Sequence, residues 1–373
     1  MPANSLIENT RAEVRNLPLY NAGLSGEMVR KQFHLEHVAK LGSNENPYGP
    51  SPRVLKAIAA AATDSGLYPD PACEVLRDPL AAALAVDPAC LLFGNGSEDL
   101  LGIATHTFVN AGDEVVTMIP SFGLHILYPQ SVGAKVHAIP VREDYCADVD
   151  KIAAAINPRT RILFIGNPSN PVGTSITLDG LQLLLKASHD NMLFVFDEAY
   201  FEYACMDQSY GDFFGLLRKA KTPWLLLRTF SKAYALAGLR VGYGAASSAE
   251  VAGLMNRIRN VFNVNRIAQA AAVAAFDDQA WMKHCVSSTI SERERLRKEL
   301  VGMGYEPAPS LANFLFFDAR EDAGELAKRL LTRGVIVKPW KEAGYTSHVR
   351  VSVGSREADD QFVQALGLER SVA

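Results

Sequence analysis

Lys232 lies in the stretch 228–240 (RTFSKAYALAGLR), where Thr229 and Ser231 precede it, Arg240 follows it, and an apolar run comes before them all. Most lysines are surface residues that stay charged. A lysine removed from water beside another cation has a lowered pKa, and its neutral amine can act as a nucleophile or a base. The position of Lys232 at the end of an apolar strand therefore predicts covalent or proton-transfer chemistry.

Two acidic residues, Asp197 and Glu198, end the apolar run 193–196, and Tyr200 follows shortly after. A carboxylate at the end of a buried strand is costly unless it is paired. The metal-holding aspartate of a nucleotide hydrolase occupies a similar place. That reading requires the P-loop pattern G-x-x-x-x-G-K-[ST], which this sequence lacks.

Two loops have backbones suited to holding a ligand. The first, 94–99 (GNGSED), lies between an apolar run and a helical stretch, where glycines allow close approach and helix amides suit a phosphate. By itself it is equally compatible with a tight turn capped by Ser97. The second, 167–173 (NPSNPVG), holds two Asn-Pro pairs and a glycine, which indicate a rigid, irregular loop that presents Asn170.

Together these residues suit pyridoxal phosphate, which needs a lysine for attachment, a carboxylate at its ring nitrogen, donors to its ring oxygen and a phosphate cradle. We expect Lys232 to supply the first and Asp197 the second. Asn170 and Tyr200 would supply the ring-oxygen contacts. The cradle would come from the hydroxyl and arginine side chains of Ser97, Thr229, Ser231 and Arg240.

The elements that must position these residues alternate between short apolar strands and amphipathic helices. Strands are predicted at 91–93, 114–117, 135–139, 161–165, 192–196, 224–228 and 241–245, with helices between several of them, including 97–109 and 178–187. This pattern is typical of an α/β fold with a mainly parallel sheet covered on both faces. The candidate residues follow the carboxyl ends of the strands, where such sheets bind ligands.

The last third of the chain has a different pattern. Helices are predicted at 268–275, 288–300 and 324–332, and short strands at 314–317, 335–338 and 349–353. A chain of 373 residues also exceeds the size of about 250–300 residues at which one core usually divides. We expect an N-terminal arm at 1–45 that joins a small α+β domain at 256–373, and a large cofactor-binding domain at 46–255. In the turn-rich stretch 44–52, Ser51 is expected to cap a helix that begins at Pro52.

Composition excludes several classes of protein. Charged residues make up 21% of the chain and the formal charge is −4, so neither nucleic acid nor membrane is an expected partner. The N-terminus lacks the pattern of a secretory signal, and a cytoplasmic protein is expected. The five cysteines are scattered and the eight histidines form no H-x-x-x-H pattern, so no metal site is predicted.

The order and spacing of these motifs resemble the fold-type I, class I/II aminotransferases that depend on pyridoxal phosphate, and the wording is most similar to the histidinol-phosphate aminotransferase family. The matching stretches cover almost the whole chain: LGSNENPYGPSP (41–52), LYPDP (67–71), GNGSEDL (94–100), NPSNPVG (167–173), DEAYFEYA (197–204), RTFSKAYALAGLRVGY (228–243), NVNRIAQAA (263–271), ANFLFF (312–317) and VRVSVGS (349–355).

The resemblance implies a role for each matching position. The catalytic residues would be Lys232, Asp197 and Tyr200. It adds to the cofactor set Phe122, stacked on the ring, Glu98 at the phosphate, and Tyr68, which would reach the cofactor of a second subunit in a homodimer with shared active sites. The substrate would meet Tyr20, Asn46, Arg350, Lys338 and Phe262. Many relatives carry arginine at the position of Lys338 and tyrosine at that of Phe262.

The implied reaction moves an amino group from a small-molecule donor to a 2-oxo acid. The resemblance favours L-histidinol phosphate as donor, imidazole acetol phosphate as its product and 2-oxoglutarate as acceptor, in histidine biosynthesis. Because Lys338 and Phe262 depart from the common pattern, transfer from an aromatic amino acid remains an alternative. A related decarboxylase, a dehydrogenase and a non-catalytic regulator are further alternatives. The third glycine of a dinucleotide fingerprint and a basic DNA-binding extension are both missing from this sequence.

Overall fold

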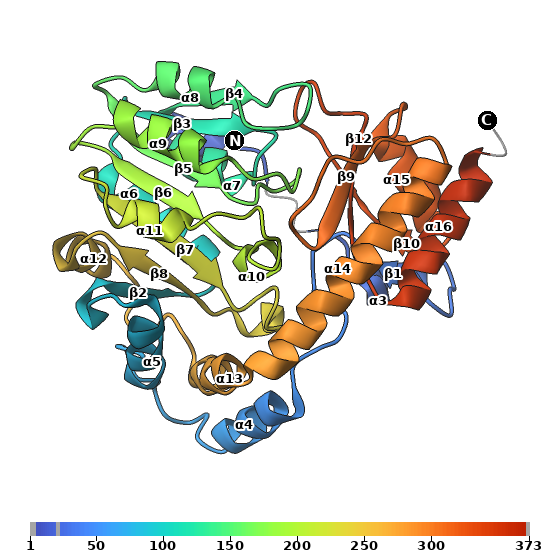
Figure 1. Cartoon of the computed structure of the whole chain (residues 1–373), viewed down its shortest axis with the longest axis horizontal. Helices are drawn as coiled ribbons and strands as arrows, with labels where there is room; N and C mark the ends of the chain where they lie inside the picture. Colours follow the sequence, from blue (N-terminus) through green and yellow to red (C-terminus); the bar gives the residue numbers. More distant parts are fainter. Residues whose placement is uncertain (1–4, 20–22, 371–373) are drawn as a thin grey trace.

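A seven-stranded sheet forms the centre of the larger part of the protein (Figure 1). The computed structural model describes residues 5–19 and 23–370. The strands are β2 (Leu91–Gly94), β3 (Glu114–Ile119), β4 (Lys135–Pro140), β5 (Thr160–Gly166), β6 (Leu193–Asp197), β7 (Trp224–Thr229) and β8 (Gly242–Ala246). Their order is β2-β8-β7-β6-β5-β3-β4, and β8 alone runs antiparallel to its two neighbours. The α/β class and all seven predicted strands are confirmed.

Helices cover both faces of this sheet because its strands alternate apolar side chains between the two sides. Phe194 and Phe196 pack in one core with helices α4 (Pro52–Ala62), α5 (Glu74–Leu84), α9 (Leu178–Ala187) and α13 (Arg266–Asp277). Leu193 and Val195 pack in the opposite core with α6 (Ser97–Phe108) and α12 (Ala249–Asn256). The remaining helices of this part are α7 (Leu124–Ser131), α8 (Val149–Ala155), α10 (Phe201–Ala204) and α11 (Phe213–Leu217), with short 3-10 turns at Pro88–Cys90 and Ala237–Leu239.

Local sequence signals account for several helix starts. The Ser51 hydroxyl accepts a hydrogen bond from the Val54 amide at 3.2 Å, and Pro52 occupies the first turn of α4, as expected. Asn265 caps α13 in the same way through the Ala268 amide at 2.8 Å. α6 differs, because Gly96 precedes it and no side chain caps its first amides.

The C-terminal part has its own core around a three-stranded antiparallel sheet in the order β11-β12-β9. Its elements are α14 (Gln279–Gly302), β9 (Phe314–Asp318), α15 (Ala323–Thr332), β10 (Val335–Ile336), β11 (Lys338–Pro339), β12 (His348–Ser352) and α16 (Arg356–Arg370). In Figure 1, α14 runs diagonally from beside α13 to this smaller layer.

The single strand predicted at 335–338 is divided in the structure. β10 pairs with β1 (Ala39–Lys40), whereas β11 pairs with β12, so the chain changes sheet at Val337. Pro339 cannot donate to a ladder, and it lies in β11 at the edge of its sheet, where a missing donor is tolerated.

The N-terminal segment contributes α1 (Ser5–Glu8), α2 (Ala12–Asn16), α3 (Gly26–Gln32) and β1. After β1, the Leu41 carbonyl accepts a hydrogen bond from the Ser352 amide at 2.8 Å, and this attaches the segment to the end of β12. The predicted domain boundaries stay a prediction. Across the described residues, none of the helices combines the length and apolar character needed to cross a bilayer.

Candidate active site

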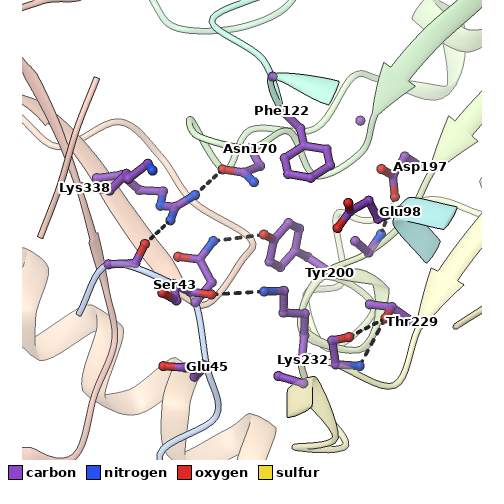
Figure 2. Close-up of a pocket in the computed structure, with 18 of the residues that line it drawn as sticks. Ser43, Glu45, Glu98, Phe122, Asn170, Asp197, Tyr200, Thr229, Lys232 and Lys338 are labelled. Carbon is purple, nitrogen blue, oxygen red and sulfur yellow. Dashed lines mark hydrogen bonds between the residues drawn. The ribbon is translucent and has the colours of Figure 1, made fainter. Parts of the chain in front are cut away.

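A cavity of about 760 Å³ opens where the carboxyl ends of the parallel strands face the C-terminal part (Figure 2). Loops after β2, β3, β5, β6 and β7 line one side, and residues of β11, β12 and the segment 42–45 line the other. The sheet order thus brings together thirteen predicted site residues: Ser97, Glu98, Phe122, Asn170, Asp197, Tyr200, Thr229, Ser231, Lys232, Arg240, Lys338 and Arg350 line the cavity, and Asn46 adjoins it.

Lys232 follows β7, and its Nζ donates a hydrogen bond to the Ser43 carbonyl at 3.2 Å, as Figure 2 shows. Burial of the ammonium group and the positive charge of Arg350 together lower the pKa of Lys232 to about 7, against the opposing effect of Glu45. A large fraction of the amine is therefore neutral near pH 7 and available as a nucleophile or base.

Asp197, the last residue of β6, is paired with a histidine that the sequence did not reveal. Its Oδ2 lies 3.3 Å from His125 Nε2, and His125 Nδ1 lies 3.1 Å from the Ser121 hydroxyl. A carboxylate only accepts hydrogen bonds, so Nε2 donates to Asp197 and Nδ1 accepts from Ser121. The imidazole ring of His125 also stacks on the Phe164 ring, with ring centroids 5.1 Å apart. This packing fixes the plane of the imidazole.

The second acid of the pair, Glu198, faces away from the cavity into a buried ion pair. Its Oε2 lies 2.7 Å from Arg228 Nη2, and its Oε1 accepts a hydrogen bond from the Tyr210 hydroxyl at 2.9 Å. The same hydroxyl accepts a hydrogen bond from Asn167 Nδ2 at 3.1 Å, so this network joins the loop after β5 to the end of β6. Each acid at the strand end is therefore paired, as the cost of burial requires.

A concave surface suited to a phosphate lies at the start of α6. Gly96 has φ +83°, a conformation that L side chains rarely adopt, and a Cβ there would overlap the Arg240 guanidinium. A Cβ at Gly242 would overlap the backbone of Ser97. Ser97 is the first residue of α6 rather than its cap. Its backbone amide is therefore one of the amides at the helix start that no side chain caps.

Hydroxyls and an arginine close this surface. Thr229 Oγ1 donates to Ser231 Oγ at 2.9 Å, and Arg240 Nη1 donates to the same oxygen at 3.4 Å. Arg240 Nη2 lies 3.6 Å from the Glu98 carboxylate, which also accepts from the Tyr128 hydroxyl at 3.4 Å. The donor set is cationic and oriented, as anion binding requires.

The opposite wall carries two cations on neighbouring strands. Lys338 of β11 and Arg350 of β12 are cross-strand partners, so both side chains stand on one face of the sheet. Arg350 Nη1 donates to Asn170 Oδ1 at 2.7 Å, and its Nη2 donates to the Gly42 carbonyl at 2.6 Å. Burial lowers the pKa of Lys338 to about 8, with a further contribution from Arg350.

Three of the predicted site residues that the structure describes do not line the cavity. Tyr68 and Phe262 stack on each other on the surface with ring centroids 4.6 Å apart. Asn46 Nδ2 donates a hydrogen bond to the carbonyl of Ala233, the residue after Lys232, at 3.0 Å. Tyr20 lies outside the described residues.

Several cavity residues were missed by sequence reasoning: Ser43, Asn44, Glu45, His125, Trp340 and Glu342. One contact set links the two parts of the protein, because Glu342 Oε2 accepts from the Trp340 indole at 2.8 Å and from the Ser121 amide at 3.3 Å. The only signal available was position, since His125 comes shortly after a predicted strand end. Ser43, Asn44 and Glu342 have hydrogen-bond partners more than a hundred residues away, which no local pattern reveals.

The described residues fit pyridoxal phosphate. At Gly96 the backbone packs so closely against Arg240, and at Gly242 against Ser97, that no side chain fits at either position, and the donors gathered there suit a phosphate. A partly neutral lysine and a carboxylate with a histidine partner line the same cavity. These features are the attachment, ring-nitrogen and phosphate groups that the cofactor needs.

Comparisons with known proteins agree with this geometry. The family model "Aminotransferase class I and II" matches residues 36–366. Histidinol-phosphate aminotransferase 3 of Rhizobium meliloti is 46% identical over 95% of this chain and 96% of its own length. Histidinol-phosphate aminotransferase 1 of Mesorhizobium japonicum is 43% identical over 95% and 97%. A crystal structure of histidinol-phosphate aminotransferase from Sinorhizobium meliloti with pyridoxal 5'-phosphate superposes with a TM-score of 0.89 at 30% identity, covering 98% of each chain.

Proposed function

Because this chain belongs to the class I and II aminotransferase family, we propose that it is a pyridoxal phosphate-dependent enzyme that transfers the amino group of L-histidinol phosphate to 2-oxoglutarate. The observation that carries the proposal is one cavity with three components. It holds a lysine whose pKa is lowered to about 7, a histidine-paired carboxylate and a glycine-built cradle. The products are imidazole acetol phosphate and glutamate, as part of histidine biosynthesis, and a cytoplasmic location stays a prediction.

Each group of the cofactor has a place among these side chains. Lys232 would hold it covalently, and Asp197 would face its ring nitrogen, with Phe122 against the ring. Asn170 and Tyr200 would contact the ring oxygen. The phosphate would lie on the α6 start among Ser97, Glu98, Thr229, Ser231 and Arg240.

When bound, pyridoxal phosphate supplies an electron-withdrawing ring that acidifies the hydrogen on the amino-bearing carbon of the donor. Asp197 would pair with the protonated ring nitrogen, and the hydrogen bond from His125 orients that carboxylate. The Lys232 amine would act as the base that takes the proton from the amino-bearing carbon of the donor, and its ammonium form would act as the acid that gives a proton back. Its lowered pKa suits both steps near neutral pH.

Substrate recognition is assigned to the cationic wall. Lys338 and Arg350 stand side by side on β11 and β12, where they can bind the phosphate of the donor or a carboxylate of the acceptor. A lysine offers a point charge rather than the planar fork of an arginine, so the bond from Lys338 carries less geometric selectivity. This chain has Phe262 where many relatives have a tyrosine. The test must therefore distinguish L-histidinol phosphate from aromatic amino acids as the amino donor.

A homodimer with shared sites forms part of the proposal. Exposed apolar side chains gather where the loop 66–75 meets the segment 258–266, and the two are joined by hydrogen bonds from Arg266 to the Tyr68 carbonyl and from Arg259 to the Pro71 carbonyl. The patch comprises Leu67, Tyr68, Val75, Ile258, Val261 and Phe262. A surface of this kind marks an interaction site.

The test is a panel of amino donors with 2-oxoglutarate: L-histidinol phosphate, L-histidinol, L-phenylalanine and L-tyrosine. We expect the phosphorylated donor to have the highest kcat/KM. Lys338→Met should raise its KM about tenfold or more, because a charge-assisted hydrogen bond is lost, with little effect on L-histidinol. Lys328→Met, on the exposed side of α15 where Lys328 pairs with Glu325, is the control with near wild-type KM. A preference for phenylalanine or tyrosine would replace the proposed substrate with an aromatic amino acid.

A further inference from the structure

Three consecutive residues of the N-terminal segment contact three functional side chains. The Gly42 carbonyl accepts from Arg350, the Ser43 carbonyl accepts from Lys232, and the Asn44 side-chain amide donates to the Tyr200 hydroxyl at 2.9 Å. Figure 2 shows Tyr200 and Lys232 pointing toward this segment from the other side of the cavity. The segment therefore connects the wall that carries Arg350 with the wall that carries Lys232 and Tyr200 through hydrogen bonds.

Asn44 is more constrained than its neighbours. It is 1% exposed, and its φ of +55° lies in the left-handed region, which asparagine tolerates better than most residues. Its backbone amide donates to Ser352 Oγ at 2.7 Å, and its carbonyl accepts from Asn313 Nδ2 at 3.0 Å. Both ends of the residue are thus held by the C-terminal part.

These bonds determine which end of the Asn44 amide faces Tyr200. A backbone N–H can only donate, so Ser352 Oγ accepts from it and directs its own proton elsewhere. That proton goes to Asn44 Oδ1, which lies 2.8 Å away. The Nδ2 group then points to the Tyr200 hydroxyl, which must accept. A phenol oxygen that accepts on this side donates its proton in another direction.

We propose that Asn44 is a positioning residue that directs the hydroxyl proton of Tyr200 toward the ring oxygen of the cofactor. The inference rests on the proposed function, because it concerns the ring-oxygen contact of the same site. Ser352 and Arg350 lie two residues apart on β12, on one face of the strand. One strand therefore holds both the side chain assigned to the substrate and the hydroxyl that orients Asn44.

The spectroscopic consequence follows from charge. A hydrogen bond from Tyr200 disperses negative charge on the ring oxygen, and this weakens the attraction of that oxygen for the proton shared with the lysine-linked nitrogen. Without the oriented bond, the linkage should hold its proton to higher pH. The pH midpoint of the visible absorbance of the Lys232-bound cofactor reports this directly and does not depend on turnover.

The experiment compares holoenzymes of wild type and Asn44→Gly. Glycine keeps the left-handed backbone and removes the amide. We expect the absorbance midpoint to rise by about one pH unit, the value of one hydrogen bond to a charged group. In the Tyr200→Phe background the same substitution should cause no further shift, because the effect passes through the hydroxyl. A midpoint unchanged in Asn44→Gly, or shifted equally in both backgrounds, would overturn the proposal.

Asn313→Ala is the matched control. It removes another buried amide that binds the Asn44 backbone but does not touch Tyr200. We expect a lower melting temperature of the apo-protein and an unchanged absorbance midpoint; an equal midpoint shift would mean that the effect is a general loss of structure.

If Asn44→Gly does not fold, Ser352→Ala replaces it. We expect a smaller rise of the absorbance midpoint in this variant, and an unchanged midpoint would count against the proposal. Failure of the proposed function would appear instead as a wild-type protein without a pH-dependent visible band.

Discussion

The ionisation of Lys232 gives the site its pH dependence at the scale of single residues. Since the pKa of Lys232 is lowered to about 7 in the folded protein, the neutral amine becomes available as the pH rises through that value, far below the pKa of 10.5 of an ordinary lysine. We predict that the rate of pyridoxal phosphate attachment to the apo-protein rises between pH 6 and 8, about one unit either side of this pKa, and is level above it.

Stopped-flow absorbance of apo-protein mixed with pyridoxal phosphate measures this rate. Arg350→Gln should move the midpoint to higher pH, because a positive charge that opposes the ammonium form is removed. Arg53→Gln, whose guanidinium pairs with Asp277 on the surface, is the matched control and should leave the midpoint in place. A rate that keeps rising past pH 9, about the behaviour of an ordinary lysine, would show that the amine is not desolvated.

Single residues also show where prediction from sequence succeeds and where it stops. Lys232 and Asp197 were predicted because each stands at the end of an apolar strand, which is a local pattern. His125 and Asn44 were not, because their partners Asp197 and Tyr200 are 72 and 156 positions away. Such a contact exists only after the sheet order has placed β3 near β6 and the N-terminal segment beside β12.

At the scale of elements, the junction of β2 and α6 depends on two glycines. We predict that Gly96→Ala weakens pyridoxal phosphate binding about tenfold or more, because a side chain there is strained at φ +83° and overlaps Arg240. Fluorescence quenching of the apo-protein measures the dissociation constant. Gly238→Ala, where the added carbon meets nothing within 4 Å, is the control and should bind normally. Equal affinity in both variants would exclude the α6 start as the phosphate site.

Element types were predicted better than element pairings. Short apolar runs and helical crossovers identified all seven strands of the large sheet, since burial on both faces leaves a strong local signal. The division of 335–338 into β10 and β11 was not foreseen, because a change of sheet depends on which partner strand is near. For β10 that partner is β1, almost three hundred residues earlier.

The whole molecule is expected to act as a pair of subunits. We predict that Val261→Asp, in the exposed apolar patch beside Phe262, shifts the protein toward monomers and lowers activity, because a charge is buried on association. Sedimentation equilibrium measures the oligomeric state. Val301→Asp, on the exposed side of α14, is the matched control and should leave the state unchanged. A Val261→Asp protein that associates and reacts like wild type would remove this patch from the interface.

The buried Glu198–Arg228 pair limits how this enzyme can diverge. Loss of either partner alone leaves an uncompensated charge in the core, at a cost of about 3–5 kcal/mol, a large part of the stability of an ordinary domain. Replacement of both together is far less costly. These two positions should therefore be substituted together in evolution. In a library of single substitutions, both should tolerate few changes, although neither side chain takes part in the reaction.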